Sequence, residues 1–168
     1  MSSSASFTLR HAREQDAASI HALKQSIYAE DKWFINDGPP SQGMIERQLR
    51  SLDVEKHLYL IAEKEKQACG WLELYCLQPK KINHIATLTL AVAKAYRGKG
   101  IARRMLEQAI VWAKTMKIHK IALNVRANNT AAIRLYDSLG FMIEGREKDQ
   151  IKLDNGFEDN LIMAKLIK

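Results

Sequence analysis

A short turn rich in glycine and basic residues is the first part of this sequence whose composition and spacing could do chemistry. It reads Arg97-Gly98-Lys99-Gly100-Ile101-Ala102. Glycines let a backbone approach a ligand closely, and the free N–H groups at a helix N-terminus suit a phosphate. Arg97 and Lys99 add positive charge at the same place. The turn therefore predicts a site for a phosphate or pyrophosphate group.

The segments on either side of the turn must position it. Residues 88–92 are apolar or β-branched and contain no turn former, which predicts a strand. After the turn, apolar residues recur at spacings of three and four, at Ile101, Met105, Ala109, Trp112 and Met116. This periodicity predicts an amphipathic helix. The predicted unit is therefore a strand, a glycine turn and a helix.

Two common phosphate-binding motifs do not fit this turn. The P-loop requires a Lys-Ser or Lys-Thr pair after its last glycine, and the sequence has none here. The dinucleotide fingerprint begins correctly at Gly98-Lys99-Gly100, but Arg103 occupies its third small position. The residues of the turn alone leave the identity of the phosphate-bearing ligand open.

Length and composition predict one soluble domain. The chain has 168 residues, of which 46% are hydrophobic and 27% charged, as in ordinary globular proteins. No window approaches the roughly 18 apolar residues of a membrane helix. Residues 1–6 lack the basic and apolar regions of a signal peptide. We expect a disordered tail at 1–6, a single domain at 7–168, a cytoplasmic location and no membrane partner.

The net charge of +7 is concentrated around the glycine turn. Residues 94–120 contain eight basic side chains and one acidic one, Glu107, whereas the rest of the chain is balanced. A nucleic-acid binder usually carries a recognised module or aromatic stacking positions on its basic face, and the sequence indicates neither. We expect a small polyanion as the ligand and no nucleic-acid partner. For residues 114–120, a solvated helix end is an equally good interpretation.

Hydrophobic periodicity predicts a mixed α/β chain with the element order β-α-α-β-β-β-α-β-α-β-β. Helices are expected from Asp16, as N-cap, to Ile27, after Ser41, and at 101–116 and 129–139. Strands are expected at 7–10, 57–62, 68–77, 84–92, 120–125, 141–147, 150–153 and 157–164. Cys69 and Cys76 would face opposite sides of one strand, which predicts reduced thiols. The histidines show no metal-ligand spacing, so we expect no metal.

A second motif follows at residues 124–141. It reads Asn-Val-Arg-Ala-Asn-Asn-Thr-Ala-Ala-Ile-Arg-Leu-Tyr-Asp-Ser-Leu-Gly-Phe, with Asn129 near the start of a predicted helix and Tyr136 near its end. Together with Arg97-x-x-Gly100-x-Ala102, this motif resembles the signatures of the GNAT superfamily of N-acetyltransferases. The predicted element order is also that of the GNAT fold. The resemblance implies an α/β (α+β) fold with a mixed, mostly antiparallel central sheet flanked by helices.

The resemblance also implies acetyl-CoA as co-substrate and a primary amine as acceptor, on a small molecule or on a protein N-terminus or lysine. The main chains of Leu90 and Val92 would bind the pantetheine arm, and Asn129 would contact it. Tyr136 would lie near the thioester sulfur. The pyrophosphate would be bound by the backbone N–H groups of Arg97, Gly98, Lys99, Gly100, Ile101 and Ala102.

Acetyl transfer to an amine needs an acid for the departing thiolate and a base for the ammonium. Tyr136 is a reasonable acid, and the Val92 N–H could stabilise the oxyanion. Two residues are candidates for the base: Glu73 lies in an apolar strand that could raise its pKa, and His84 is a histidine, the residue type that ordinarily changes charge near neutral pH. A solvent-facing role fits either one equally well, and we prefer Glu73. A covalent route through a cysteine lacks an activating histidine.

Two hypotheses about function follow. The first is acetyl transfer by direct attack of the amine in a ternary complex. The alternative is a non-catalytic acyl-CoA-binding regulatory module of the same fold, which an intact Tyr136 and Asn129 disfavour. The acceptor carries no readable motif, although Trp33 and Phe34 beside Asp31 and Asp37 would suit a cationic amine. Edge strands in such a sheet permit a homodimer.

Overall fold

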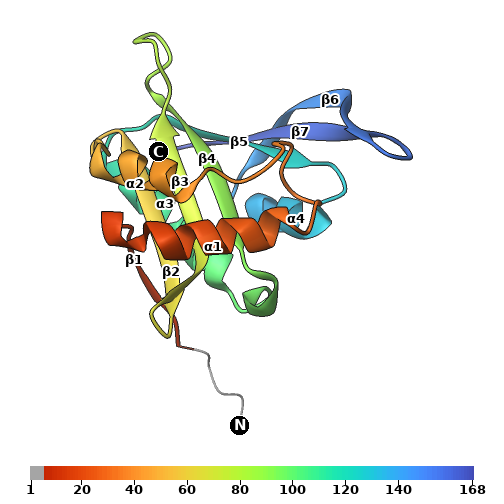
Figure 1. Cartoon of the computed structure of the whole chain (residues 1–168). Coiled ribbons are helices and arrows are strands. Elements are labelled where there is room, and N and C mark those ends of the chain that lie inside the picture. Colours follow the sequence, from red (N-terminus) through yellow and green to blue (C-terminus); the bar gives the residue numbers. More distant parts are fainter. Residues whose placement is uncertain (1–5) are drawn as a thin grey trace. The chain divides into compact units, whose positions relative to one another are not determined.

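The chain folds into a seven-stranded sheet flanked by helices in a computed structural model that describes residues 6–168 (Figure 1). Most of the predicted N-terminal tail, residues 1–5, lies outside the described residues. The strands are β1 (Thr8–His11), β2 (His57–Lys64), β3 (Gln67–Cys76), β4 (Ile85–Val92), β5 (Lys120–Arg126), β6 (Met142–Leu153) and β7 (Gly156–Leu166). The α-helices are α1 (Ala17–Tyr28), α2 (Gln42–Arg50), α3 (Ile101–Thr115) and α4 (Thr130–Ser138).

The sheet combines parallel and antiparallel pairs, as expected. Its strands hydrogen-bond in the order β1-β2-β3-β4-β5-β7-β6. β4 and β5 are parallel, whereas β1 and β2, β5 and β7, and β6 and β7 are antiparallel. The parallel register runs from Ile85 paired with Lys120 to Thr87 paired with Ala122. The predicted α/β class and the order β-α-α-β-β-β-α-β-α-β-β are confirmed, although two of the predicted strand ranges, 141–147 and 150–153, belong to one strand.

The chain divides into two compact units. The first contains the residues up to Leu74 together with Thr89–Ala109, and the second contains Tyr75–Leu88 and Ile110–Lys168. β3, β4 and α3 each contribute residues to both units. The first unit therefore carries the glycine turn, and the second carries the segment of the second motif.

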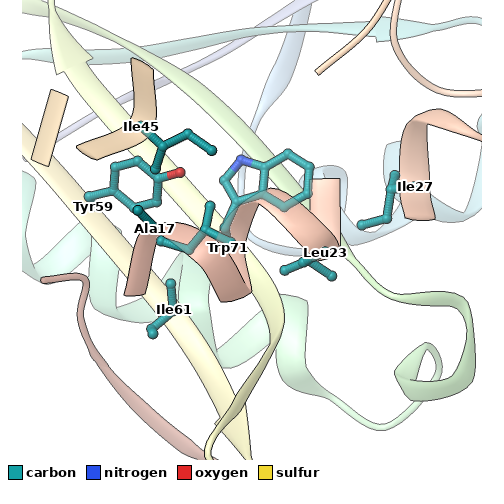
Figure 2. Packing of buried hydrophobic residues seen from close by; sticks show 8 residues of the cluster. Ala17, Leu23, Ile27, Ile45, Tyr59, Ile61 and Trp71 are labelled. Carbon is teal, nitrogen blue, oxygen red and sulfur yellow. The ribbon is translucent and has the colours of Figure 1, made fainter. Parts of the chain in front are cut away.

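The core of the first unit lies where α1 and α2 pack against β2 and β3. In α1 the residues Ile20, Leu23 and Ile27 recur at helical spacing and are buried. They pack with Ile45 of α2 and with a group of strand residues shown in Figure 2, namely Tyr59, Ile61 and Trp71. Figure 1 shows α1 running across β2 and β3. This packing places α1 over one face of β3, where Lys24 of α1 contacts Glu73 of β3.

The two helix starts behave differently. α2 begins directly after Ser41, as expected, and Ser41 caps it, because its hydroxyl accepts the N–H of Met44 at 3.3 Å. Asp16 stands at the N-cap position of α1, but its carboxylate does not accept an N–H of that helix. The carboxylate instead accepts the N–H of Arg13 at 2.7 Å and pairs with Arg10 at 2.7 Å. The predicted capping role of Asp16 is therefore wrong, because a strand arginine competes for the same oxygens.

The second unit is organised around the long hairpin of β6 and β7. β7 pairs with β5 from Lys120–Leu166 to Arg126–Asn160. The two segments predicted separately at 141–147 and 150–153 form the one strand β6. Its pairing with β7 shifts register between Glu147 and Ile151, and Asp149 there has a φ of 52°. A bulge of this kind interrupts the pattern of alternation and makes one strand read as two.

Two smaller expectations concern the thiols and the membrane. Cys69 and Cys76 both lie on β3, and both are free cysteines, as predicted. Over the described residues, we find no helix with the length and hydropathy that a membrane span requires.

Candidate functional site

The glycine turn joins β4 to α3 in the first unit. After Val92, a short 3-10 turn (η2, Lys94–Tyr96) leads to Arg97, and α3 begins at Ile101. Gly98 and Gly100 have φ values of 72° and 80°, in the left-handed region that side chains rarely adopt. A Cβ atom placed on either glycine would meet nothing within 4 Å. The predicted strand, turn and helix are confirmed, and the space beside both glycines is open.

The start of α3 leaves backbone donors at this open space. The N–H of Arg104 donates to the carbonyl oxygen of Gly100 at 3.1 Å, which begins the helical ladder. The N–H groups of Ile101 and Ala102 precede that bond, and the first N–H groups of an α-helix have no partner within the helix. Such groups, together with the positive end of the helix dipole, can bind a phosphate.

The last residues of β4 present backbone groups along one edge of the strand. The N–H of Ala93 donates to the carbonyl oxygen of Cys69 on β3 at 2.9 Å. Successive residues of a strand point their backbone groups to opposite edges. The N–H and C=O groups of Val92 and Leu90 therefore face away from β3. These two residues, predicted to hold the pantetheine arm, offer donors and acceptors on the same edge.

The side chain of Arg97 is bonded to the protein. Its Nη1 and Nη2 donate to the two carboxylate oxygens of Glu30 at 2.8 and 2.6 Å. Its Nε donates to the carbonyl oxygen of Val92 at 2.9 Å. The Lys99 ammonium also bonds locally, to the carbonyl oxygen of Ala95 at 2.9 Å. Backbone N–H groups are therefore the main donors that the turn offers to an anion.

Glu73, the preferred candidate for the base, lies on β3 and points toward α1. One carboxylate oxygen accepts Lys24 Nζ at 2.8 Å, and the other accepts Gln48 Nε2 at 2.7 Å. His57 Nε2 lies 3.6 Å from the second oxygen. The Lys24–Glu73 pair is almost completely buried, with exposed side-chain fractions of 7% and 12%. Lys24 Nζ also lies 4.9 Å from the centre of the Trp71 ring.

The expected rise in the pKa of Glu73 is wrong. Burial does raise the pKa of this carboxyl group, as predicted. The hydrogen bonds from His57, Lys24 and Gln48, with the positive charge of Lys24, lower it by more, to about 2. Sequence reasoning missed Lys24, which helps to lower the pKa of Glu73. The available signal was a lysine on the apolar stripe of α1, since a buried cation requires an anionic partner.

Tyr136 and Asn129 lie on α4 of the second unit. Tyr136 is buried, and its ring centre lies 5.7 Å from that of Phe141. Burial raises the pKa of its hydroxyl to about 12. The side-chain oxygen of Asn129 accepts the N–H of Ala132 at 3.2 Å and so caps α4. The structure thus gives Asn129 a local role in starting the helix.

His84, the second candidate for the base, stands immediately before β4. Its side chain is exposed. Its ring centre lies 5.9 Å from that of His119, and its carbonyl oxygen accepts the N–H of His119 at 2.9 Å. Val92 is the last residue of the same strand. His84 and Val92 therefore belong to opposite ends of β4.

The predicted site residues fall into two groups. The glycine turn, the Leu90 and Val92 backbone and Glu73 belong to the first unit. Tyr136, Asn129 and His84 belong to the second. Sequence reasoning missed Glu30, whose partner Arg97 is 67 residues away along the chain. No sequence signal marks that pairing. Within the described part of the chain, no group of three His, Cys, Asp or Glu side chains could hold a metal ion.

Known proteins resemble this chain over nearly its whole length. The spermidine N(1)-acetyltransferase of Vibrio cholerae is 25% identical over 154 residues, which cover 90% of this chain and 88% of that protein. The L-amino acid N-acetyltransferase AaaT of Escherichia coli is 27% identical, with coverage of 94% and 96%. The crystal structure of the ribosomal-protein-alanine N-acetyltransferase from Brucella melitensis has a TM-score of 0.86 at 27% identity, with coverage of 95% and 99%.

A family model agrees with these individual similarities. The model of the acetyltransferase (GNAT) family matches residues 17–141, a range that contains both the glycine turn and the second motif. This match covers most of the chain. The relatives differ in the acceptor that their names give, and they share the activity of an N-acetyltransferase. The chain therefore belongs to the GNAT family of acetyltransferases.

Proposed function

We propose that this enzyme transfers the acetyl group of acetyl-CoA to a primary amine by direct attack in a ternary complex. The observation that carries the proposal is the glycine turn of the first unit. Gly98 and Gly100 adopt left-handed conformations beside open space, directly before the N-terminus of a 15-residue helix. The backbone of residues 97–102 would bind the pyrophosphate of acetyl-CoA there.

The edge of β4 would bind the rest of the donor. The N–H and C=O groups of Leu90 and the N–H of Val92 face away from β3 and suit the amides of a pantetheine arm, whereas the Val92 carbonyl oxygen accepts Arg97 Nε at 2.9 Å. The N–H of Val92 would also stabilise the oxyanion that forms when the amine attacks the thioester. Asn129 caps α4 with its side chain, and we propose that it contacts the cofactor arm as well.

Tyr136 is the proposed acid. A departing thiolate has a pKa of about 8.5, so it needs a proton at neutral pH. Burial raises the pKa of Tyr136 to about 12, so its hydroxyl is protonated at neutral pH and carries the proton that the role of an acid requires. The developing thiolate would take the proton from Tyr136 as the C–S bond breaks, and the tyrosine would regain one from solvent.

Glu73, the preferred candidate for the base, has a restricted role in this proposal. Its pKa of about 2 keeps it ionised at neutral pH but makes it a weak base for an ammonium of pKa near 10. We therefore propose that the attacking amine belongs to the small fraction of acceptor that has already lost its proton to solvent, and that Glu73 attracts and orients the acceptor. His84 is the alternative, and its place at the other end of β4 from Val92 disfavours it.

The proposed acceptor is a small-molecule amine or a protein amine. Relatives are named for spermidine, L-amino acids and a ribosomal-protein alanine, so the family match does not select among these classes. Segment 31–41 precedes α2 and carries Trp33 and Phe34. The ring centre of Phe34 lies 4.8 Å from that of Tyr28 and 5.7 Å from that of Trp71, and both pairs of rings are stacked. The aromatic rings that the sequence offers to a cation are therefore partly used in packing.

Release of free CoA thiol from acetyl-CoA tests the proposal. The purified chain would be incubated with acetyl-CoA and a panel of spermidine, the twenty amino acids and a peptide with an N-terminal alanine. We expect amine-dependent thiol release for at least one class. Mass spectrometry should show an added acetyl group on the acceptor.

The alternative, a non-catalytic acyl-CoA-binding module, makes a different prediction. It would bind acetyl-CoA in calorimetry and release no thiol with any amine. A chain that fails to bind acetyl-CoA at all would contradict both readings of the glycine turn.

A further inference from the structure

Glu30 is a charged residue of the first unit that has no role in the proposed reaction. It lies two residues beyond the C-terminus of α1, at the start of segment 29–41 that leads to α2. Its side chain is 17% exposed and accepts both terminal nitrogens of Arg97. A two-point bond between a guanidinium and a carboxylate is directional and strong. It ties the beginning of segment 29–41 to the first residue of the glycine turn.

Further contacts make this junction rigid. Trp33 Nε1 donates to Glu30 at 3.0 Å, and the guanidinium carbon of Arg97 lies 5.5 Å from the centre of the Trp33 ring. The hydrogen bond from Arg97 lowers the pKa of the Glu30 carboxyl group, so the pair stays charged at neutral pH. Arg97 is therefore held from two sides by one short segment.

The same guanidinium reaches the edge of β4. Its Nε donates to the Val92 carbonyl oxygen at 2.9 Å, on the edge that faces away from β3. Arg97 also has extended backbone torsions, with φ of −68° and ψ of 157°, and it directly precedes Gly98. One side chain thus contacts Glu30 and Val92 while its backbone starts the glycine turn.

We propose that Glu30 is a positioning residue for the donor, acting through Arg97 on the Val92 edge and the glycine turn. Through the same pair, a CoA molecule bound at the turn stabilises segment 29–41. This inference rests on the proposed function, because it takes the turn as the CoA site. In this proposal the side chain of Arg97 contacts Glu30, and the backbone of Arg97 forms part of the glycine turn.

Calorimetric titration with CoA gives the first test. Glu30→Gln keeps the shape of the side chain and removes its charge, and Arg97→Lys keeps the charge and removes the two-point geometry. We expect either change to weaken CoA binding by about tenfold, the scale of one charged hydrogen bond. Because Glu30 acts through Arg97, the double variant should bind CoA no more weakly than Arg97→Lys alone.

The matched control is Glu14→Gln. Glu14 also forms an arginine pair in the first unit, with Arg50 at 2.5 Å, and both of these side chains are exposed. This variant should bind CoA like the wild type. Thermal unfolding of all variants separates lost positioning from lost folding. Additive losses in the double variant, or equal losses in Glu14→Gln, would overturn the proposal.

Hydrogen exchange gives a readout that general destabilisation would not mimic. In the wild type, CoA should slow exchange of the amides of residues 98–102 and also of residues 31–38. In Glu30→Gln at saturating CoA, the turn should remain protected while residues 31–38 exchange as in the free protein. Unchanged protection of residues 31–38 in this variant would contradict the link. Failure of the wild type to bind CoA would instead contradict the proposed function.

Discussion

At the scale of single residues, the chain uses burial in two opposite ways. Tyr136 is buried beside Phe141, and burial raises its pKa to about 12. Glu73 is buried as well, yet its pKa falls to about 2, because Lys24, Gln48 and His57 stabilise its charged form. Burial alone therefore does not decide the proton affinity of a group; its partners do.

Tyr136→Phe should reduce turnover by roughly a hundredfold or more while leaving acetyl-CoA affinity close to that of the wild type. The hydroxyl supplies a proton only as the thiolate leaves, and general acid catalysis has this magnitude. Steady-state kinetics and calorimetric titration measure the two quantities separately. A large loss of affinity at unchanged turnover would contradict the role of Tyr136 as the acid.

Glu73→Gln should lower stability in a way that depends on pH. The folded-state pKa of Glu73, about 2, lies below its ordinary value of 4.5. Its ionisation therefore stabilises the fold above pH 4.5, and this contribution is lost as the pH falls toward 2. The shift corresponds to about 3 kcal/mol. Urea unfolding at several pH values should show the gap between wild type and variant shrinking over that range.

The control for this experiment is Glu14→Gln, which removes an exposed carboxylate that also pairs with an arginine. Its gap to the wild type should be small at every pH, because exposed ion pairs contribute little. An equally large and equally pH-dependent gap for Glu14→Gln would show that the effect of Glu73→Gln does not come from its buried partners.

At the scale of elements, the glycine turn works through backbone geometry. β4 ends at Val92, α3 begins at Ile101, and the segment between them must reverse direction. Gly98 and Gly100 make this possible, because they adopt positive φ values of 72° and 80°. The residues of η2 bring Arg97 back to the Val92 carbonyl, so the end of the strand and the start of the turn are fixed together.

Gly100→Asp should abolish measurable CoA binding in calorimetry. The change forces a side chain into the left-handed region and puts a negative charge where a phosphate would sit. Gly100→Ala adds only the strain and should weaken binding less. Gly156→Asp is the control, since a Cβ atom there also meets nothing within 4 Å and its φ of 144° is likewise positive, so charge and strain are added away from the turn. Retained CoA affinity in Gly100→Asp would refute the assignment of the turn.

At the scale of the whole molecule, the two compact units share elements of secondary structure. β4 passes from the second unit to the first at Thr89, and α3 passes from the first to the second after Ala109. A strand and a helix are each cooperative along their length, because their hydrogen bonds support one another. No separate linker joins the two units, because the chain passes from one to the other within elements of secondary structure.

We therefore expect one cooperative unfolding transition for the chain. Differential scanning calorimetry should give a calorimetric enthalpy equal to the van't Hoff enthalpy. Saturating CoA should move the whole transition upward, because a ligand that binds only the folded state stabilises it. Two resolved transitions, of which CoA moves only one, would mean that the units fold independently.

The sequence by itself determined the local features of this protein. Periodicity and turn residues specified the strand, the glycine turn and the helix, since backbone preferences act between neighbours. The Asn129 and Tyr136 motif pointed to the GNAT family, which the family match confirmed. Its errors were also local: a bulge near Asp149 divided one strand into two, and Asp16 looked like a helix cap.

Only the tertiary structure decided which charges meet. Lys24 and Glu73 are 49 residues apart in sequence, and Glu30 and Arg97 are 67 apart. From the sequence alone, each of these residues could be an ordinary surface charge or a catalytic residue. Packing of α1 on β3 brings Lys24 to Glu73, whose pKa falls because its hydrogen-bonding partners and the charge of Lys24 outweigh the effect of burial. The end of α1 brings Glu30 to the glycine turn. Proton affinity and positioning depend on partners brought together by folding, which no local pattern encodes.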